Sequence, residues 1–189
     1  MLILASESPR RRQLLGELGI PFVVKSAQVT ELEQADDACS VSLLPQMNAE
    51  LKARAVSRLC PEDIVIGADT AIIFENEMIG KPRDLDDARK ILTKLSGKTH
   101  QVVTGIAVLR GGEKPLRFVW REVSEVGFKE LSPAVIEEYI QQVHVLDKAG
   151  AYAIQEHGDM IISSWENMNN IIGLPLERLK NVLTECCSC

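Results

Sequence analysis

The sequence predicts an α/β fold in which a mixed, twisted sheet is flanked by helices. In its first part, short apolar runs typical of strands alternate with segments whose apolar residues recur at helical spacing. In its middle, two strand-like segments, 99–109 and 118–128, are joined by Gly111-Gly112, which favours a hairpin. Hairpins pair strands antiparallel and strand–helix–strand units pair them parallel, so we expect both kinds of pairing in one sheet.

Composition indicates one globular domain. The 189 residues are 46% hydrophobic and 25% charged, which is enough for a core, and the net charge of −6 disfavours binding to nucleic acid. Met1 leads directly into the first strand and no apolar run reaches membrane-span length, so we expect no signal peptide and no membrane partner. The odd count of five cysteines and the wide scatter of Cys39 and Cys60 argue against a disulfide framework and favour the cytoplasm. Three of them lie in 186–189, which we interpret as a frayed, exposed end rather than a metal site.

The first twenty residues predict a strand, a tight turn and a helix. Residues 2–5 form a short apolar strand, Ser8 suits the N-cap, and Pro9 suits the first helical position. Gly19 suits the helix end.

This turn is a candidate anion site. The hydroxyl of Ser6, the N–H groups of the helix start and the guanidinium groups of Arg10 and Arg11 would converge there. Cations in a first helical turn oppose the helix dipole, at a cost of about a few tenths of a kcal/mol each. The alternative is a plain junction with solvated arginines, and this cost disfavours it.

The remaining strands are predicted from apolar, β-branched runs. The segment 64–74 is the most apolar and is expected to be a buried strand. The others, beside the two hairpin strands, are expected at 21–24, 78–79 and 160–162.

Helices are predicted where apolar residues share one face. They are expected at 46–59, from Asp84 to Leu95, from Ser132 to Val143, and after Pro175. The polar stretch 26–42 lacks such periodicity, and we expect a loop there with one helical turn. The segment 147–155 is compact and made of polar and small residues, and 170–175 is expected to be a loop.

Asp69 is the residue most indicative of chemistry, because a carboxylate inside an apolar strand is unfavourable unless it is paired or binds a metal. It could hold a metal, orient a water or accept its proton, or it could simply cap a bend or pair with a structural cation. Lys52 and Lys81 could reach the same cleft, although each alone is equally well a surface lysine. Glu31 is not distinguishable by spacing from Glu33. These residues indicate phosphate binding and acid-assisted, metal-dependent hydrolysis without identifying a substrate.

Six segments, in this order, resemble the Maf family of nucleotide pyrophosphatases over nearly the whole chain. They are Leu4 to Arg11, Gly67 to Thr70, Gly80 to Asp84, Leu95 to Gly97 with His100 and Thr104, Asp147 to Gln155, and Asn170 to Leu176.

The resemblance implies a single domain, 1–189, with two lobes around a deep cleft, as in the inosine triphosphatase-like fold, and a homodimer. It also implies an enzyme that uses a divalent cation, Mg²⁺ or Mn²⁺, to hydrolyse a nucleoside triphosphate to its monophosphate and pyrophosphate. The segment from Asp147 to Gln155 resembles the subgroup that prefers dTTP and UTP. The alternatives are a regulator of cell division or septum formation that binds nucleotide, and an enzyme that prefers another base such as 7-methyl-GTP.

Residue roles follow from the same resemblance. Asp69 matches the catalytic acid, acting as base toward water, and with Glu31 it matches the metal ligands. The phosphate-binding positions are matched by Ser6, Arg10, Arg11, Lys52 and Lys81, and the base-selecting positions by Arg10, Thr70 and Gln155. After Gln155 this chain has Glu156-His157-Gly158 where the family commonly has Gly-x-Gly, a difference that bears on base selectivity more than on the chemistry.

Overall fold

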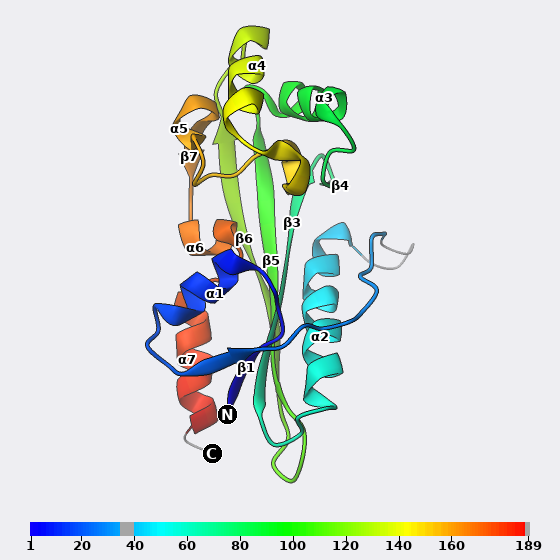
Figure 1. The fold of residues 1–189 in the computed structure, drawn as a ribbon, viewed down its shortest axis with the longest axis vertical. Helices are drawn as coiled ribbons and strands as arrows, with labels where there is room; N and C mark the ends of the chain where they lie inside the picture. The colour runs from blue at the N-terminus through cyan, green and yellow to red at the C-terminus, as the bar shows by residue number, and fades with distance from the viewer. Residues whose placement is uncertain (35–39, 188–189) are drawn as a thin grey trace. The chain divides into compact units, whose positions relative to one another are not determined.

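The computed structural model describes residues 1–34 and 40–187 and contains a seven-stranded sheet (Figure 1). The strands are β1 (Leu2–Leu4), β2 (Phe22–Val24), β3 (Ile64–Phe74), β4 (Glu77–Ile79), β5 (Thr99–Arg110), β6 (Leu116–Phe128) and β7 (Ile162–Trp165). Their order is β2-β1-β3-β5-β6-β7, with β4 paired to β3. β1 is parallel to β2 and β3, whereas β4 and β7 are antiparallel to β3 and β6, so the predicted mixed sheet is confirmed.

Seven α-helices occur in the described residues. They are α1 (Pro9–Gly16), α2 (Leu44–Ser57), α3 (Leu85–Leu95), α4 (Pro133–Gln142), α5 (Gly158–Ile161), α6 (Met168–Ile172) and α7 (Leu176–Cys187). Within the same residues, no helix combines the length and the apolar character that crossing a membrane requires.

The chain divides into two compact units. The first comprises Met1–Thr70, Val103–Glu122 and Asn169–Cys189, and the second comprises Ala71–Val102 and Val123–Met168. β3, β5 and β6 each contribute residues to both units.

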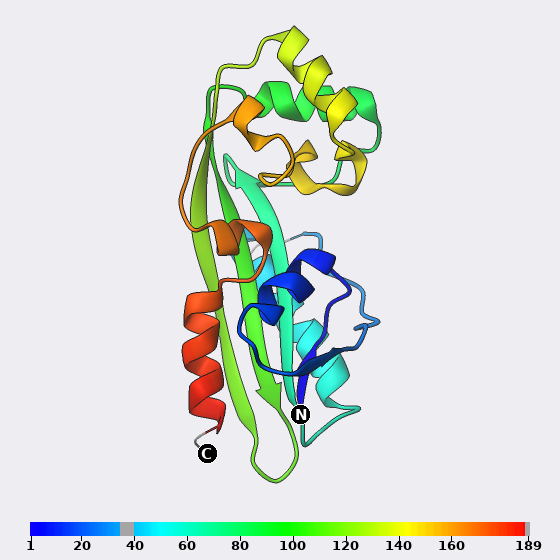
Figure 2. The same ribbon diagram turned by 60° about the vertical axis from the view of Figure 1, so that its left-hand side comes forward.

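In the first unit, helices cover both faces of the sheet. Alternate strand residues point to opposite faces, so Leu4 and Ile66 pack toward α1 and α7, whereas Ile3 and Val65 pack toward α2. Figures 1 and 2 show α1 and α7 on one side of the strands and α2 on the other. The same alternation sends the side chains of neighbouring residues in β3 to different helices.

Two glycines let α2 approach the sheet closely. A Cβ atom added to Gly67 would lie 2.1 Å from the carbonyl oxygen of Ala49, and one added to Gly105 would lie 2.2 Å from the backbone nitrogen of Gln46. Side chains that α2 presents to this face are therefore held close to the backbone of β3.

In the second unit, α3 and α4 pack together (Figure 2), and three rings form a cluster. His100, Phe128 and Tyr152 meet edge to face, with centroid distances of 5.0 to 5.4 Å. Nε2 of His100 and the hydroxyl of Tyr152 are 2.8 Å apart. Burial lowers the pKa of His100 to about 4, so this imidazole is neutral near neutral pH.

Near the end of the second unit, the expected strand at 160–162 is wrong in part. Met160 and Ile161 belong to α5, and β7 starts at Ile162. His157 has a left-handed backbone with φ of 53°, and the chain then turns into a helix at Gly158. A three-residue apolar run fits either structure, which is why periodicity did not decide.

Three further expectations need correction. α1 ends at Gly16, and Gly19 lies in the following turn with φ of 69°. Part of the expected loop at 170–175 is helical, because α6 extends to Ile172. Cys186 is 3% exposed and packs in the core, because α7 continues through it and Leu183 and Cys186 share an inward face. Residues 188–189 lie outside the described part of the chain.

Candidate active site

The polar cluster of the first unit forms where β1 ends and β3 continues. Leu4 is paired with Ile66, and the backbone nitrogen of Ala5 donates to the carbonyl oxygen of Ile66 at 2.8 Å. The chain then leaves the sheet at Ser6, while β3 runs on to Asp69. The edge of β3 is therefore open to side chains after Ile66, until β4 begins to pair with it at Ile72.

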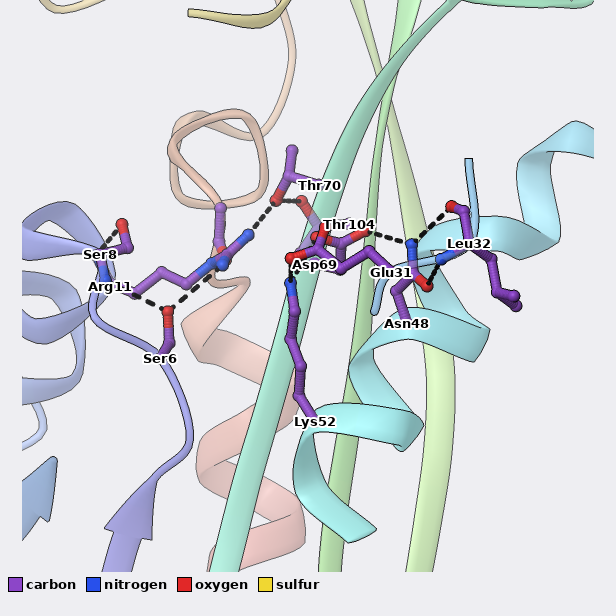
Figure 3. A network of polar contacts seen from close by, with 11 residues as sticks. Ser6, Ser8, Arg11, Glu31, Leu32, Asn48, Lys52, Asp69, Thr70 and Thr104 are labelled. Carbon is purple, nitrogen blue, oxygen red and sulfur yellow. Dashed lines mark hydrogen bonds and ion pairs between the residues drawn. The ribbon is translucent and has the colours of Figure 1, made fainter. Parts of the chain in front are cut away.

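Asp69 lies on the face that carries α2, and Lys52 is its main partner. The ammonium nitrogen of Lys52 is 2.8 Å from Oδ1 of Asp69 and 2.8 Å from Oε1 of Glu31. The side chains of Lys52 and Asp69 are 11% and 14% exposed, whereas that of Glu31 is 50% exposed. Figure 3 shows Lys52 extending from α2 toward Asp69. One cation therefore joins a half-exposed carboxylate to a largely buried one.

Asn48 holds the loop that carries Glu31. Its Oδ1 accepts from the backbone nitrogen of Leu32 at 2.7 Å, and its Nδ2 donates to the carbonyl oxygen of Leu32 at 3.1 Å. Nδ2 also lies 3.2 Å from Oδ2 of Asp69. Sequence reasoning missed Asn48, although its position four residues before Lys52 places both on one helix face.

Arg11 lies on the other side of β3 and is held by three acceptors. It donates from Nε to the carbonyl oxygen of Gly173 at 3.0 Å, from Nη1 to Oγ of Ser6 at 3.4 Å, and from Nη2 to Oγ1 of Thr70 at 3.0 Å. The hydroxyl of Ser8 accepts from the backbone nitrogen of Arg11, as expected of an N-cap (Figure 3). These bonds use three of the five guanidinium N–H groups, so two remain to contact a ligand.

A hydroxyl chain supports this arginine. Oγ1 of Thr70 is 2.9 Å from Oγ1 of Thr104, which donates to the carbonyl oxygen of Asn170 at 2.8 Å. Thr104 and Asn170 are both fully buried. The chain fixes Thr70 between β5 and α6, so its hydroxyl is held for Arg11.

The charges of the cluster act on one another. Burial lowers the pKa of Arg11, while the carboxylates of Asp69 and Glu31 raise it and the neighbouring Arg10 lowers it. Two cations, Arg11 and Lys52, thus lie near two carboxylates, and an exposed third cation, Arg10, stands at the start of α1. Such an arrangement can donate hydrogen bonds to an incoming oxyanion while keeping a carboxylate beside it.

Six of the sequence-predicted residues come together in this unit. They are Ser6, Arg11, Glu31, Lys52, Asp69 and Thr70. Arg10 is exposed on α1, and Lys81 and Gln155 are exposed residues of the second unit. The roles of Arg10, Lys81 and Gln155 in the site remain predictions.

The carboxylates of Glu31 and Asp69 suit a divalent cation that takes its other ligands from a substrate and water. Within residues 1–34 and 40–187, no group of three or more His, Cys, Asp and Glu side chains has an arrangement that could hold a metal ion. Glu31 and Asp69 nevertheless approach the same cationic group, the ammonium of Lys52. Two carboxylates are a usual protein contribution to Mg²⁺ when substrate phosphates and waters supply the other ligands. The two residues therefore fit a metal that is bound together with a phosphate substrate.

Comparison with solved structures gives the fold class of this chain. A HAM1 protein from Coxiella burnetii superposes with a TM-score of 0.57 at 19% identity, over 97% of this chain and 98% of the other. The Staphylococcus aureus Ham1 protein gives 0.51 at 16% identity with the same coverage. These likenesses show a shared α/β fold, as the fold prediction expected.

Sequence comparison then gives the family. The Maf-like protein family matches residues 1–186. A dTTP/UTP pyrophosphatase of Akkermansia muciniphila is 45% identical in an alignment 188 residues long, which covers 96% of this chain and 94% of the relative. Another protein of that name, from Symbiobacterium thermophilum, is 44% identical over 97% of this chain and 93% of the relative. The chain belongs to the Maf family, and the resemblance read from the sequence is confirmed.

Proposed function

We propose that this chain is a metal-assisted nucleoside triphosphate pyrophosphatase that hydrolyses dTTP and UTP to their monophosphates and pyrophosphate. One observation carries the chemistry: a largely buried carboxylate, Asp69, is held by Lys52 and Asn48 beside the arginine-bearing turn at Ser6. A binding site for anions alone has no use for that carboxylate. A hydrolase needs one, because a water must be oriented and deprotonated as it attacks phosphorus.

Each residue has a distinct part in the reaction. Ser6, Arg10 and Arg11 bind the phosphates, and the remaining N–H groups of Arg11 donate to phosphoryl oxygens. Lys52 offsets negative charge between the substrate and the carboxylates. Asp69 accepts the proton of the attacking water as the water oxygen bonds to phosphorus and the α–β phosphoanhydride bond breaks, so pyrophosphate separates from the monophosphate.

Glu31 and Asp69 would hold the divalent ion, Mg²⁺ or Mn²⁺, whose hard character suits carboxylate oxygens. When bound, the ion polarises phosphoryl oxygens. Asn48 contributes by fixing the backbone next to Glu31, so both carboxylates keep their spacing.

Substitution of Asp69 by Asn tests the role of the base. We expect turnover to fall by about a hundredfold or more with the fold retained, because the amide cannot accept the proton. Pyrophosphate release is measured with dTTP, and circular dichroism checks folding. Asp159→Asn, at an exposed carboxylate of the second unit, is the matched control and should retain full turnover. Near-normal turnover of the Asp69 variant would remove Asp69 from this role.

A substrate panel tests the preference. The names of the two relatives and the segment from Asp147 to Gln155 support dTTP and UTP as substrates. We expect pyrophosphate release from these two to exceed that from purine triphosphates, 7-methyl-GTP included. Preference for 7-methyl-GTP would overturn the substrate assignment, and nucleotide binding without pyrophosphate release would favour a regulatory protein instead.

The single two-lobed domain and the homodimer rest on the family resemblance, and the cytoplasmic location rests on the cysteine pattern. Light scattering of the purified chain tests the homodimer. Lys81 as a phosphate ligand, and Arg10, Thr70 and Gln155 as base-selecting residues, are tested by the same substrate panel on single variants.

A further inference from the structure

Four arginines surround a small pocket elsewhere in the first unit, where α2 ends beside the β5–β6 hairpin. Arg54 and Arg58 come from the end of α2, and Arg110 and Arg117 come from the adjoining ends of β5 and β6. The pocket has a volume of about 180 Å³, and Ser57 also lines it. Such a concentration of cations is unusual in a chain whose net charge is −6.

Two of the arginines have a carboxylate partner in Glu50. Its Oε1 lies 2.6 Å from Nη2 of Arg54 and 2.8 Å from Nε of Arg117, and its Oε2 lies 3.0 Å from Nη2 of Arg117. The hydrogen bond from Arg117 is the largest influence that lowers the pKa of Glu50. Glu50 therefore holds both guanidinium groups at the pocket while neutralising one of them.

Arg110 is the residue that most strongly indicates a ligand. Its Nε donates to the carbonyl oxygen of Lys114 at 2.7 Å. Its Nη2 is buried and has no hydrogen-bond partner among residues 1–34 and 40–187. A buried donor without an acceptor costs about 1–3 kcal/mol, more when it belongs to a charged group. Arg110 lines the pocket, so an anion bound there would offset part of this cost through its charge.

The plain explanation for two of these arginines is the end of α2, because cations stabilise a helix C-terminus. That explanation covers Arg54 and Arg58 but not Arg110 or Arg117, which lie on strands. A helix end carries only about half a negative charge. A second carboxylate, Glu62, lies against the hairpin turn at Gly112. Four guanidinium groups against two carboxylates and a helix end still leave a positive surplus.

We propose that this pocket is a second anion site, which binds a small oxyanion of the phosphate class. Planar guanidinium groups suit the oxygens of such ions, which accept several bidentate hydrogen bonds at once. Pockets for drug-sized ligands have about 300–1,000 Å³, so the observed volume suits an inorganic ion rather than a whole nucleotide. The site is distinct from the cluster around Asp69, and its occupation does not depend on the proposed reaction.

Side-chain NMR of the arginines tests the site directly. The Nε–Hε signals are assigned from single variants and followed while inorganic phosphate, pyrophosphate or a non-hydrolysable nucleoside triphosphate is added at constant ionic strength. We expect the Arg110 and Arg58 signals to shift saturably with millimolar phosphate or with less pyrophosphate. Arg110→Met, which keeps the aliphatic stem, should reduce affinity at least tenfold, as read from the Arg58 signal. Arg121→Met, at an exposed arginine outside the pocket, should leave affinity unchanged.

Three results would overturn the proposal. The Arg110 and Arg58 signals could remain still with phosphate and with pyrophosphate, or chloride at matched ionic strength could move them equally. A response to the nucleotide alone would overturn the assignment to a small ion. Inactivity toward nucleotides would leave all these readouts intact, so this test is separate from that of the proposed function.

Discussion

At the scale of single residues, Asn48 couples the loop and the strand of the candidate active site. It has one side-chain amide and binds three partners with it: both backbone polar groups of Leu32 and the carboxylate of Asp69. Glu31 is half exposed and adjoins the clamped residue. The spacing of the two carboxylates around Lys52 therefore depends on a residue that need not touch the substrate.

Asn48→Leu removes this clamp while keeping a side chain of similar size. We expect turnover to fall about 10- to 100-fold, as is typical when a group that orients ligands is lost. Hydrogen exchange is the independent readout, because the amide of Leu32 loses its acceptor and should exchange faster. Asn181→Leu, at an exposed position on α7, is the control for a general effect of the substitution. Unchanged exchange at Leu32 would show that the loop is held by other contacts.

The sequence revealed part of this site for physical reasons. Asp69 could be identified because a carboxylate in an apolar strand needs a partner. Glu31 could not be separated from Glu33, because pairing with Lys52 depends on how an aperiodic loop folds back on α2. Asn48 carries a neutral amide on a helix, and only its spacing of four residues from Lys52 links it to the site.

At the scale of elements, the contact of α2 with the sheet sets the site geometry. β3 has glycine at position 67, and the helix fills the space that a side chain there would occupy. Asp69, two residues further along the strand, points to the same face. The close packing of α2 on β3 therefore also sets the contact between Lys52 and Asp69.

Gly67→Ala tests this packing. The added Cβ would lie 2.1 Å from the carbonyl oxygen of Ala49 and 2.9 Å from Cβ of Ala53, so the helix must shift. We expect a loss of about 1–3 kcal/mol in the free energy of unfolding, typical of overpacking, measured by urea denaturation. Turnover should fall as well. In Gly80→Ala no atom lies within 4 Å of the new Cβ, so that variant should keep its stability.

His100 in β5 makes stability depend on pH. Burial lowers its pKa to about 4, so the unfolded chain, with the ordinary pKa of 6.5, binds the proton first as pH falls. Stability contributed by this group is complete above pH 6.5 and is lost toward pH 4, at about 1.4 kcal/mol per pH unit at most. Urea denaturation at pH 6.5 and 4.5 should show a smaller acid loss for His100→Gln than for the unsubstituted chain, by about 2 kcal/mol. His144→Gln, at an exposed histidine, should match the unsubstituted chain.

Helices and strands could be predicted from the sequence where their residue patterns were long. The bounds of β3 follow from an eleven-residue apolar run, and the starts of α3 and α4 follow from the caps Asp84 and Ser132. Short elements were not, because α5 has four residues and α6 five, too few for a helical period to appear. Their placement depends on tertiary contacts, such as the hydrogen bond from Thr104 to Asn170.

At the scale of the whole molecule, an acidic chain must bind an acidic substrate. The net charge is −6, and a triphosphate is strongly negative, so the overall field opposes binding. In the candidate active site the cations Arg11 and Lys52 are themselves close to the carboxylates Asp69 and Glu31. Local cations alone therefore leave little surplus positive charge for the phosphates, and a divalent ion would supply it.

Removal of divalent cations should consequently abolish turnover. We expect pyrophosphate release to stop in EDTA and to return with Mg²⁺ or Mn²⁺, because two carboxylates and the substrate phosphates together make an oxygen site for these ions. Glu31→Gln should raise the Mn²⁺ concentration needed for half-maximal rate by about tenfold, since one anionic ligand is lost. Electron paramagnetic resonance of free Mn²⁺ measures binding without relying on activity, and Glu33→Gln is the matched control from the same loop. Equal Mn²⁺ affinity in the two variants would separate Glu31 from the metal and leave it as a partner of Lys52 alone.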